Sequence, residues 1–395
     1  PREVSIPGNS DVVSLDAGPF HTCSGLNDGS LYCWGYNGFG QLGVGDTVKS
    51  PIPTKVATEA SENGSDIQTG LFHSCALYDS GGVACWGDNS VGQLGDGTTV
   101  DRLTMTPVSL DQGRTAVSIR SGKAHTCSTL DNGEVRCWGK NDHGQLGDGT
   151  NSDSSTPVQV GLSGNKALAV SSGANHTCAV LDNANVKCWG DNTYGQLGQE
   201  DNSNRGDGSN EMGSNLNAID LGSGRTATSI TTGTGYSCAL LDDASVKCWG
   251  RGHYGQLGHG KSNDLDSPAN LSITLGTGRT AKTIAAGNFH TCAILDNSSI
   301  KCWGSNDSGQ LGLGDTSNRG DGSNEMNDNL PVVDLGSGKT VRGISTGDSH
   351  TCTVLDNASV KCWGKNDSGQ LGIGNTNTLG DGSGEMGDNL PAISL

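Results

Sequence analysis

The stretch that decides the fold is His176-Thr-Cys-Ala-Val-Leu-Asp-Asn-Ala-Asn-Val-Lys-Cys-Trp-Gly-Asp-Asn-Thr-Tyr-Gly-Gln-Leu-Gly198. Near-copies of it begin at His21, His73, His125, Tyr236, His290 and His350, which makes seven copies in all. Every copy has two cysteines ten positions apart, Trp-Gly directly after the second cysteine, and Gly-Gln-Leu-Gly six residues past the tryptophan. A glycine also stands three residues before the first His or Tyr of every copy, which predicts a tight turn there.

The spacing of these copies predicts a repeat architecture. Successive first cysteines are 51 to 60 residues apart, a period typical of propeller blades. Each repeat reads as four short strands: a segment before the Gly-x-x-His turn, the His-x-Cys segment, the Val-x-Cys-Trp segment, and a weaker outer segment such as Pro157–Val160. Short strands at even spacing, with glycine turns and no helical periodicity, predict an all-β, seven-bladed β-propeller with four-stranded blades.

The repeat positions also predict the blade boundaries within a single domain, 1–395. The seven blades are expected at approximately 11–60, 61–112, 113–164, 165–222, 223–276, 277–336 and 337–395. Residues 1–10 and Leu390–Ser394 both have strand character, and either segment could complete the last blade and cover its edge.

Composition excludes several classes of function. Glycine accounts for 63 residues, so the modest 32% hydrophobic content still fits a folded, turn-rich protein. The net charge of −18, without any Lys/Arg cluster, argues against nucleic-acid binding and against anionic lipid surfaces. No apolar run approaches the roughly 18 residues of a membrane span. The chain begins at Pro1 without an initiator Met, as expected of a mature or trimmed form, so the compartment must be inferred from the cysteines.

The pattern Gly-x-x-His…Asp…Trp-Gly-x-Asn-x-x-Gly-Gln-Leu-Gly resembles the regulator-of-chromosome-condensation repeat over essentially the whole chain. The resemblance implies a seven-bladed propeller. It does not imply one function, because members include a nuclear nucleotide-exchange factor, a plant ultraviolet photoreceptor, ubiquitin-ligase modules and a secreted bacterial inhibitor. What these members share is protein–protein contact across a loop-bearing face. The cysteines depart from the family pattern, in which small or apolar residues usually occupy both positions.

The two cysteines of each repeat are predicted to form a disulfide, because they would face each other on adjacent antiparallel strands. The predicted pairs are Cys23–Cys33, Cys75–Cys85, Cys127–Cys137, Cys178–Cys188, Cys238–Cys248, Cys292–Cys302 and Cys352–Cys362. Two alternatives are reduced cysteines that serve as small core residues, and a metal site such as His176, Cys178 and Cys188. Disulfides fit better, and they predict a secreted, extracellular or cell-surface protein.

Glycosylation tripeptides are consistent with that compartment. They begin at Asn63, Asn175, Asn270, Asn297, Asn306, Asn357 and Asn366. A chain rich in Asn, Ser and Thr produces some of these by chance, so they are candidate sites only.

The repeated histidines and tryptophans are interpreted as structural. A histidine at one equivalent position per blade, replaced once by Tyr236, lacks the asymmetric partners that catalysis requires. The seven tryptophans all occupy the internal Cys-Trp-Gly position, which predicts blade packing rather than light sensing. No catalytic residue and no enzymatic activity are therefore predicted.

Three repeats carry insertions after Gly-Gln-Leu-Gly, at 205–212, 319–326 and 379–386. They are predicted to form an acidic, loop-rich rim that contacts the partner, with these candidate residues: Arg205, Asp207, Glu211, Arg319, Asp321, Glu325, Asp381 and Glu385. Two insertions contain Arg-Gly-Asp, but the third has Leu379 at the Arg position. Weak calcium candidates are Asp321, Glu325, Asp328, Asp381, Glu385 and Asp388, although their spacing is not that of a calcium loop.

These observations favour a non-enzymatic extracellular interaction or structural module without a cofactor, calcium aside. The expected partner is another protein or a second copy of the chain. One alternative is a lectin-like propeller, for which Tyr36, Phe39, Tyr194 and Tyr254 would be the residues that contact the glycan. The other alternative is guanine-nucleotide exchange on a small GTPase, against which the disulfides and the acidic balance count.

Overall fold

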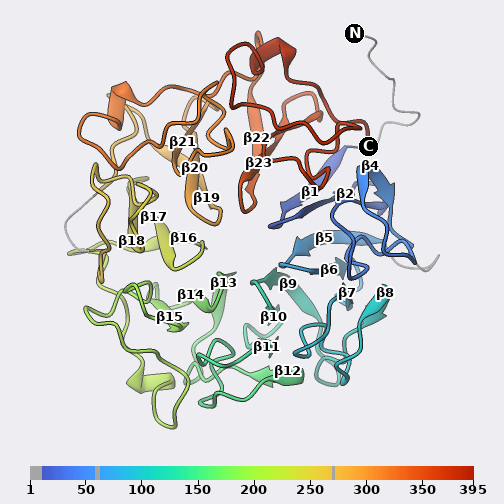
Figure 1. Cartoon of the computed structure of the whole chain (residues 1–395). Helices are drawn as coiled ribbons and strands as arrows, with labels where there is room; N and C mark the ends of the chain where they lie inside the picture. Colours follow the sequence, from blue (N-terminus) through green and yellow to red (C-terminus); the bar gives the residue numbers. More distant parts are fainter. Residues whose placement is uncertain (1–10, 58–62, 269–271) are drawn as a thin grey trace.

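The computed structural model describes residues 11–57, 63–268 and 272–395. Seven antiparallel sheets stand in chain order around a central channel, as Figure 1 shows. The predicted seven-bladed propeller is confirmed, because each repeat forms one sheet and its first strand is innermost.

The sheets consist of consecutive strands, each five or six residues long. Blade 1 contains β1 (Val12–Ala17), β2 (His21–Leu26), β3 (Leu31–Gly35) and β4 (Ser50–Lys55); blade 2 contains β5 (Gly64–Thr69), β6 (His73–Tyr78), β7 (Val83–Gly87) and β8 (Arg102–Pro107); blade 3 contains β9 (Ala116–Ser121), β10 (His125–Leu130), β11 (Val135–Gly139) and β12 (Ser154–Gln159). Blade 4 contains β13 (Ala167–Ser172), β14 (His176–Leu181), β15 (Val186–Gly190) and the 3₁₀ turn η1 (Gly213–Asn215); blade 5 contains β16 (Ala227–Thr232), β17 (Tyr236–Leu241) and β18 (Val246–Gly250). Blade 6 contains β19 (Ala281–Ala286), β20 (His290–Leu295), β21 (Ile300–Gly304) and η2 (Asn327–Asn329); blade 7 contains β22 (Val341–Thr346), β23 (His350–Leu355), β24 (Val360–Gly364) and η3 (Gly387–Asn389).

The outermost position differs between the two halves of the ring. Blades 1 to 3 have a complete fourth strand, as predicted. Among the described residues, blades 4 to 7 have only isolated bridges and backbone hydrogen bonds at this position, such as Gly304 with Arg319 and Val333 N to Ile300 O at 2.9 Å. In blades 4, 6 and 7 the inserted loops interrupt the strand between its two ends, which is why a regular fourth strand does not form there.

One repeated set of hydrogen bonds joins neighbouring blades. The backbone carbonyl of the Gln in each Gly-Gln-Leu-Gly turn accepts bonds from the next blade's Trp indole and from its Thr or Ser hydroxyl. Between blades 2 and 3, Gln93 O lies 3.0 Å from Trp138 Nε1 and 3.1 Å from Thr126 Oγ1. His73 Nε2 lies 2.9 Å from the same Thr126 hydroxyl. Each blade is therefore tied to the next through buried polar groups as well as through apolar packing.

These bonds determine the state of the buried histidines. The Thr126 hydroxyl has one proton, which it donates to the Gln93 carbonyl, so His73 must donate from Nε2. The other ring nitrogen, Nδ1, has no partner in the described part of the chain. Burial lowers the pKa of His73 to about 4 and that of His125 to about 3, so both rings are neutral near pH 7. The prediction that these histidines are structural is confirmed.

The same bonds close the ring between blades 7 and 1. Trp34 Nε1 and Thr22 Oγ1 both lie 2.9 Å from Gln370 O. The C-terminal segment supplies the outer position of blade 7, where Ile393 pairs with Val360. The other segment with predicted strand character, 1–10, lies outside the described residues.

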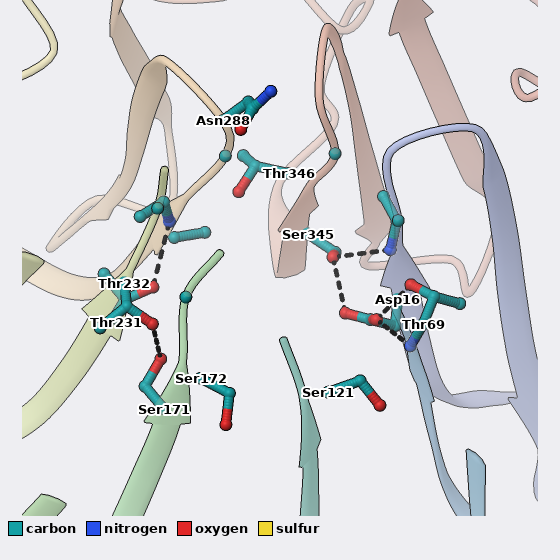
Figure 2. Close-up of a pocket in the computed structure, with 18 of the residues that line it drawn as sticks. Asp16, Thr69, Ser121, Ser171, Ser172, Thr231, Thr232, Asn288, Ser345 and Thr346 are labelled. Carbon is teal, nitrogen blue, oxygen red and sulfur yellow. Dashed lines mark hydrogen bonds between the residues drawn. The ribbon is translucent and has the colours of Figure 1, made fainter. Parts of the chain in front are cut away.

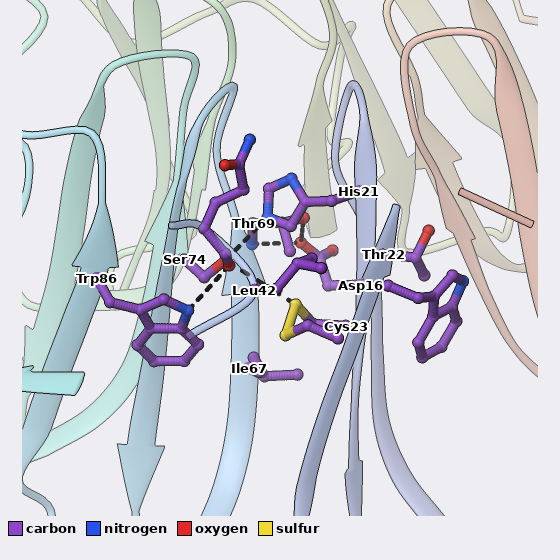
Figure 3. The surroundings of a disulfide bond; sticks show 12 residues. Asp16, His21, Thr22, Cys23, Leu42, Ile67, Thr69, Ser74 and Trp86 are labelled. Carbon is purple, nitrogen blue, oxygen red and sulfur yellow. Dashed lines mark hydrogen bonds between the residues drawn. A yellow bond between two sulfur atoms is a disulfide. The ribbon is translucent and has the colours of Figure 1, made fainter. Parts of the chain in front are cut away.

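Seven disulfides join the second and third strands of the seven blades, with the pairing that was predicted. The strand register places the two cysteines directly opposite, and in blade 3 the Cα atoms of Cys127 and Cys137 are 4.1 Å apart. Figure 3 shows the bridge of Cys23 beside Leu42 and Trp86 in the apolar layer between blades 1 and 2. Both alternatives, reduced core cysteines and cysteine-containing metal sites, are therefore wrong.

Candidate functional site

A channel of about 660 Å³ runs along the axis of the ring. The innermost strands β1, β5, β9, β13, β16, β19 and β22 line it, with serine and threonine as the commonest side chains. Figure 2 shows Ser171, Thr231 and Ser345 on this wall. Ser171 and Thr231 each bond to the next blade: Ser171 Oγ lies 2.8 Å from Thr232 Oγ1, and Thr231 Oγ1 accepts from Ala286 N at 3.1 Å.

Asp16 is a half-buried carboxylate of the channel wall. Its Oδ2 accepts from Thr69 N at 2.7 Å and from Thr69 Oγ1 at 2.5 Å, and its Oδ1 accepts from Ser345 Oγ at 3.2 Å. Burial raises the pKa of Asp16, while these hydrogen bonds oppose the rise. Since Asp16 links blade 1 to blades 2 and 7, the geometry assigns it to ring closure rather than to proton transfer.

A second candidate site is the end of the propeller that we call the aromatic face. It consists of the Gly-x-x-His turns, between the first and second strands, and the loops that follow the third strand. The second strand starts at this end, and the antiparallel third strand returns to it, so both sets of loops share one face. Two groups of aromatic side chains lie there, one on blades 1 and 2 and one on blades 4 to 6.

The first aromatic group contains Phe20, Tyr36, Phe39 and Phe72. Phe20 and Phe72 stack with their ring centroids 5.6 Å apart. Phe72 also contacts Tyr36 at 5.8 Å and Phe39 at 4.8 Å. All four side chains are half-buried, so the group presents apolar ring surface to solvent.

The second aromatic group surrounds a cation. The guanidinium carbon of Arg251 lies 4.9 Å from the ring centroid of Tyr194, 5.7 Å from that of Tyr254 and 4.7 Å from that of Phe289. Tyr254 and Phe289 are themselves in contact at 5.1 Å. The four aromatic residues proposed for glycan binding, Tyr36, Phe39, Tyr194 and Tyr254, are therefore divided equally between the two groups.

Sequence reasoning missed Arg251 and three phenylalanines of the aromatic face, Phe20, Phe72 and Phe289. A signal was nevertheless present, because Gly252 replaces the asparagine that follows Trp-Gly-x in every other repeat. In those repeats the asparagine organises the loop: Asn141 Oδ1 accepts from Leu146 N at 2.9 Å, and its Nδ2 donates to Thr150 O at 3.0 Å.

The three insertions lie on the outer circumference of blades 4, 6 and 7 (Figure 1). Arg205 and Arg319 begin them by pairing with the third strand, and each donates to an aspartate four residues earlier. Leu379 makes the same backbone pairing, so the bridge does not require arginine. Glu211 Oε2 accepts from Gly206 N at 3.0 Å and from Gly208 N at 2.9 Å, and Glu325 and Glu385 repeat these bonds.

Each insertion also packs on the preceding blade. Asp207 lies against Gly144, and Asp321 and Asp381 lie against the equivalent glycines, Gly255 and Gly309. The insertions therefore act as clasps between blades, and much of their charge is used within the loop. Their predicted role in partner contact stays a prediction.

The calcium candidates do not gather into a cation site. Asp321 and Glu325 lie together, and burial followed by the contact with Glu325 raises the pKa of Asp321. Asp328, however, accepts from Thr277 N at 2.7 Å and from its hydroxyl at 2.5 Å. Asp381, Glu385 and Asp388 divide in the same way, with Asp388 bonded to Ser337. Within the described ranges, no group of three His, Cys, Asp or Glu side chains could hold a metal ion.

The glycosylation candidates fall into different environments. Asn306 and Asn366 are fully buried and donate from Nδ2 to carbonyls of their own loops, so these two predictions are wrong for the folded protein. Asn175 is half-buried. Asn63, Asn297 and Asn357 are exposed, and their Nδ2 atoms have no hydrogen-bond partner in the described part of the chain. Asn270 lies outside the described residues.

The fold defines a class of protein, the propellers related to the regulator of chromosome condensation. Yeast RCC1 (Prp20), in the structure described as Kap60 bound to yeast RCC1, superposes with a TM-score of 0.73 at 18% identity, covering 100% of this chain and 90% of that one. Human WBSCR16 superposes with a TM-score of 0.74 at 20% identity, covering 89% of each chain.

Sequence comparison gives the family. The RCC1-like domain matches residues 108–383, and the RCC1 repeat matches residues 28–77 and 80–128. Ultraviolet-B receptor UVR8 of Arabidopsis thaliana is 30% identical over 375 residues, covering 94% of this chain and 81% of the receptor. The chain belongs to the RCC1 family. It is also 29% identical to human E3 ubiquitin-protein ligase HERC2 over 365 residues, but these are only 7% of that protein.

The described residues contain no helix that is long and apolar enough to span a bilayer.

The tryptophans are fully buried in all seven blades, which confirms their predicted packing role. The indoles are thus core groups, and the exposed aromatic surface consists of phenylalanine and tyrosine.

Proposed function

We propose that this chain is a non-enzymatic protein-interaction propeller that works outside the cell and docks its partner on the aromatic face. The observation that carries the proposal is the pair of aromatic groups on that face, one around Phe72 and one around Arg251. Aromatic residues and arginine are enriched where proteins bind one another, because they bury large areas at a low cost in conformational entropy.

The compartment is inferred from the cysteines. All fourteen are paired in disulfides buried between blades. Reducing compartments keep such thiols free, so seven bridges favour an extracellular or other oxidising location. The same fold serves as the ectodomain of the Arabidopsis receptor kinase ACR4, at a TM-score of 0.53 and 17% identity.

Named relatives favour an interaction role over catalysis. UVR8 is called a receptor, and the Prp20 structures are described with Kap60 and with binding to Gsp1p and histones. HERC2 is called a ubiquitin ligase, but this chain matches only a small part of it. None of these partners is assigned to the present chain.

The test first identifies a partner by capture and then measures its binding to two parallel sets of variants. Proteins of the source organism's secreted and surface fractions would be captured on the propeller, identified by mass spectrometry, produced separately and titrated against it. Removing aromatic rings with Phe72→Ala or Phe39→Ala should weaken binding at least about 10-fold. Matched variants of the perimeter clasps, Glu211→Gln and Glu325→Gln, should bind like the unmodified chain. Loss of binding only in the clasp variants would move the contact surface to the circumference and contradict the proposal.

Carbohydrate binding is the second candidate, because Tyr36 and Phe39 present part-exposed rings side by side with Phe72. A glycan array with the unmodified chain and Tyr36→Ala separates this candidate from protein binding. A glycan signal that depends on Tyr36, without any protein partner, would favour the lectin-like function.

A further inference from the structure

The fifth repeat breaks the sevenfold pattern at the aromatic face. The residue before its Tyr236 is Gly235, where blades 1, 2 and 6 have phenylalanine. A Cβ atom at Gly235 would come within 2.9 Å of Tyr194 Cδ2 and 3.7 Å of Arg251 Cβ. The missing side chain thus makes room for Tyr194 and Arg251 to approach each other. Departures from a local rule without an evident structural gain are expected at functional sites.

Arg251 stands at the third position of the Trp-Gly-x loop, where two other repeats also have a cation. Lys140 Nζ lies 2.9 Å from Asp142 and Lys365 Nζ lies 3.4 Å from Asp367, so each lysine is paired within its own loop. The fifth repeat has His253 where those aspartates stand. Arg251 therefore lacks the internal counter-charge that this position has elsewhere in the ring.

The rest of the described chain leaves almost no arginine unpaired. Every described arginine except Arg251 and Arg342 forms an ion pair with a carboxylate. Arg342 is exposed, whereas Arg251 is half-buried with a buried Nε that has no partner among the described residues. The chain has a net charge of −18 and therefore many carboxylates. A half-buried guanidinium without a carboxylate partner is unusual in such a chain, because burying an unpaired charge costs free energy.

The aromatic rings prepare Arg251 for a ligand. The guanidinium lies over the rings of Tyr194 and Phe289, at 4.9 and 4.7 Å from their centroids. Contacts of this kind cover the faces of the planar group, and since Nε is buried, the two terminal nitrogens are the donors in its plane that remain for a carboxylate. A bidentate pair of this type is both strong and directional. A neutral sugar, by contrast, needs open ring faces for stacking, and here the cation occupies them.

We propose that Arg251 recognises a carboxylate presented by an acidic peptide segment of the partner protein. This inference rests on the proposed function and identifies the chemistry of its contact. The strongly negative charge of the chain repels acidic segments elsewhere, so Arg251 also determines where on the ring such a segment can dock. The apolar group around Phe72, on the same face, offers a second contact for neighbouring apolar side chains.

The test uses random 12-residue peptides displayed on phage as the probe, selected on the oxidised propeller. Enriched peptides are then synthesised with each Asp or Glu, and with its Asn or Gln replacement, and titrated by fluorescence anisotropy. Three variants are compared with the unmodified chain: Arg251→Gln, which removes the charge; Arg251→Lys, which keeps the charge but loses the planar pair of donors; and His253→Asp, which supplies the internal partner found beside Lys140 and Lys365. Each variant must keep all seven disulfides and the thermal midpoint of the unmodified chain.

The expected result is enrichment of peptides in which one carboxylate is essential. Its replacement by the amide, Arg251→Gln and His253→Asp should each weaken binding about 10- to 100-fold, with Arg251→Lys intermediate. Peptides that need Phe72 but tolerate Arg251→Gln and the amide replacement would overturn this inference and leave the proposed function standing. If no peptide is enriched, or if only acidic glycans on an array require Arg251, both the inference and the protein-binding proposal fail.

Discussion

Lowering the pH from 7 to 5 should destabilise this propeller, because six of its blades contain a buried neutral histidine. Burial lowers the pKa of His21, His125, His290 and His350 to about 3, and that of His73 and His176 to about 4. The ordinary value is 6.5. Between these values the unfolded chain binds protons that the folded chain does not bind, so the free energy of unfolding falls as the pH falls.

The size of the effect follows from the pKa differences. One pKa unit corresponds to about 1.4 kcal/mol, so each histidine lowers the free energy of unfolding by about 2 kcal/mol between pH 7 and pH 5. Six histidines together give a loss on the order of 10 kcal/mol, comparable with the whole stability of a typical domain. Asp16, Asp321, Asp348 and Asp381 act in the opposite direction, because their pKa values are raised, first by burial, and the folded chain then binds protons on them more readily.

The assay is urea unfolding with the disulfides intact, followed by the fluorescence of the buried tryptophans at pH values from 8 to 5. The chain offers its own control, since the Tyr236 hydroxyl makes the link between blades 5 and 6 by donating to His290 O at 2.6 Å. The substitution His73→Tyr introduces the equivalent tyrosine hydroxyl into blade 2. The variant should lose about one sixth of the pH dependence, or about 2 kcal/mol between pH 7 and 5. A free energy of unfolding that is constant over this range, or a variant with undiminished pH dependence, would refute the buried-histidine argument.

Three further predictions concern the bridges, the clasps and the exposed tripeptides. Replacing both Cys292 and Cys302 with alanine should lower the free energy of unfolding by about 2–3 kcal/mol in urea titrations, since it removes the constraint on a short loop in the unfolded chain; an unchanged stability would contradict this. Gly144→Ala would place a Cβ atom 2.2 Å from Asp207 N at a φ of +77°, whereas Gly113→Ala meets nothing within 4 Å at a φ of +75°. The first should therefore cost about 2–5 kcal/mol and speed proteolysis of the clasp, the second about 1 kcal/mol, and equal losses would exclude a steric clasp. Expressed through a eukaryotic secretory pathway, the chain should carry glycan at Asn297 and none at the two buried tripeptides, as glycopeptide mapping would reveal.

Much of this architecture could be predicted because seven copies of one motif constrain one another. Two cysteines placed symmetrically about a hairpin loop must face each other if the strands pair. In the structure Cys178 is paired directly with Cys188 in the strand register. The sequence did not predict burial in the loops. Asn306 fits a glycosylation tripeptide as well as Asn297 does, but its amide is fully buried and organises the loop. The tripeptide describes chemistry that an enzyme recognises, and it does not specify whether the side chain is accessible.

The insertions illustrate a second limit of sequence reasoning. Their acidic composition indicated a contact surface or a calcium site, because carboxylates on a loop usually face water. In the folded chain Glu325 accepts two backbone N–H groups of its own loop, and Asp328 binds the turn at Thr277. The loop needs these acceptors because its backbone N–H groups are not paired in a regular fourth strand. Composition alone cannot distinguish a carboxylate that binds a partner from one that satisfies its own backbone.

Internal repetition offers a way to separate structure from function within a single chain. Some departures from the repeat are compensated: Tyr236 keeps the link between blades that histidine makes elsewhere, and Leu379 keeps the backbone bridge of Arg205. Such changes preserve the ring and carry no information about a ligand. Arg251 is different, because its departure adds a half-buried charge and omits the aspartate that pairs with the equivalent lysines. Burying this charge costs free energy that no contact within the fold offsets, and a partner that pairs with Arg251 would offset it. The aromatic face is therefore the surface to test before the acidic perimeter.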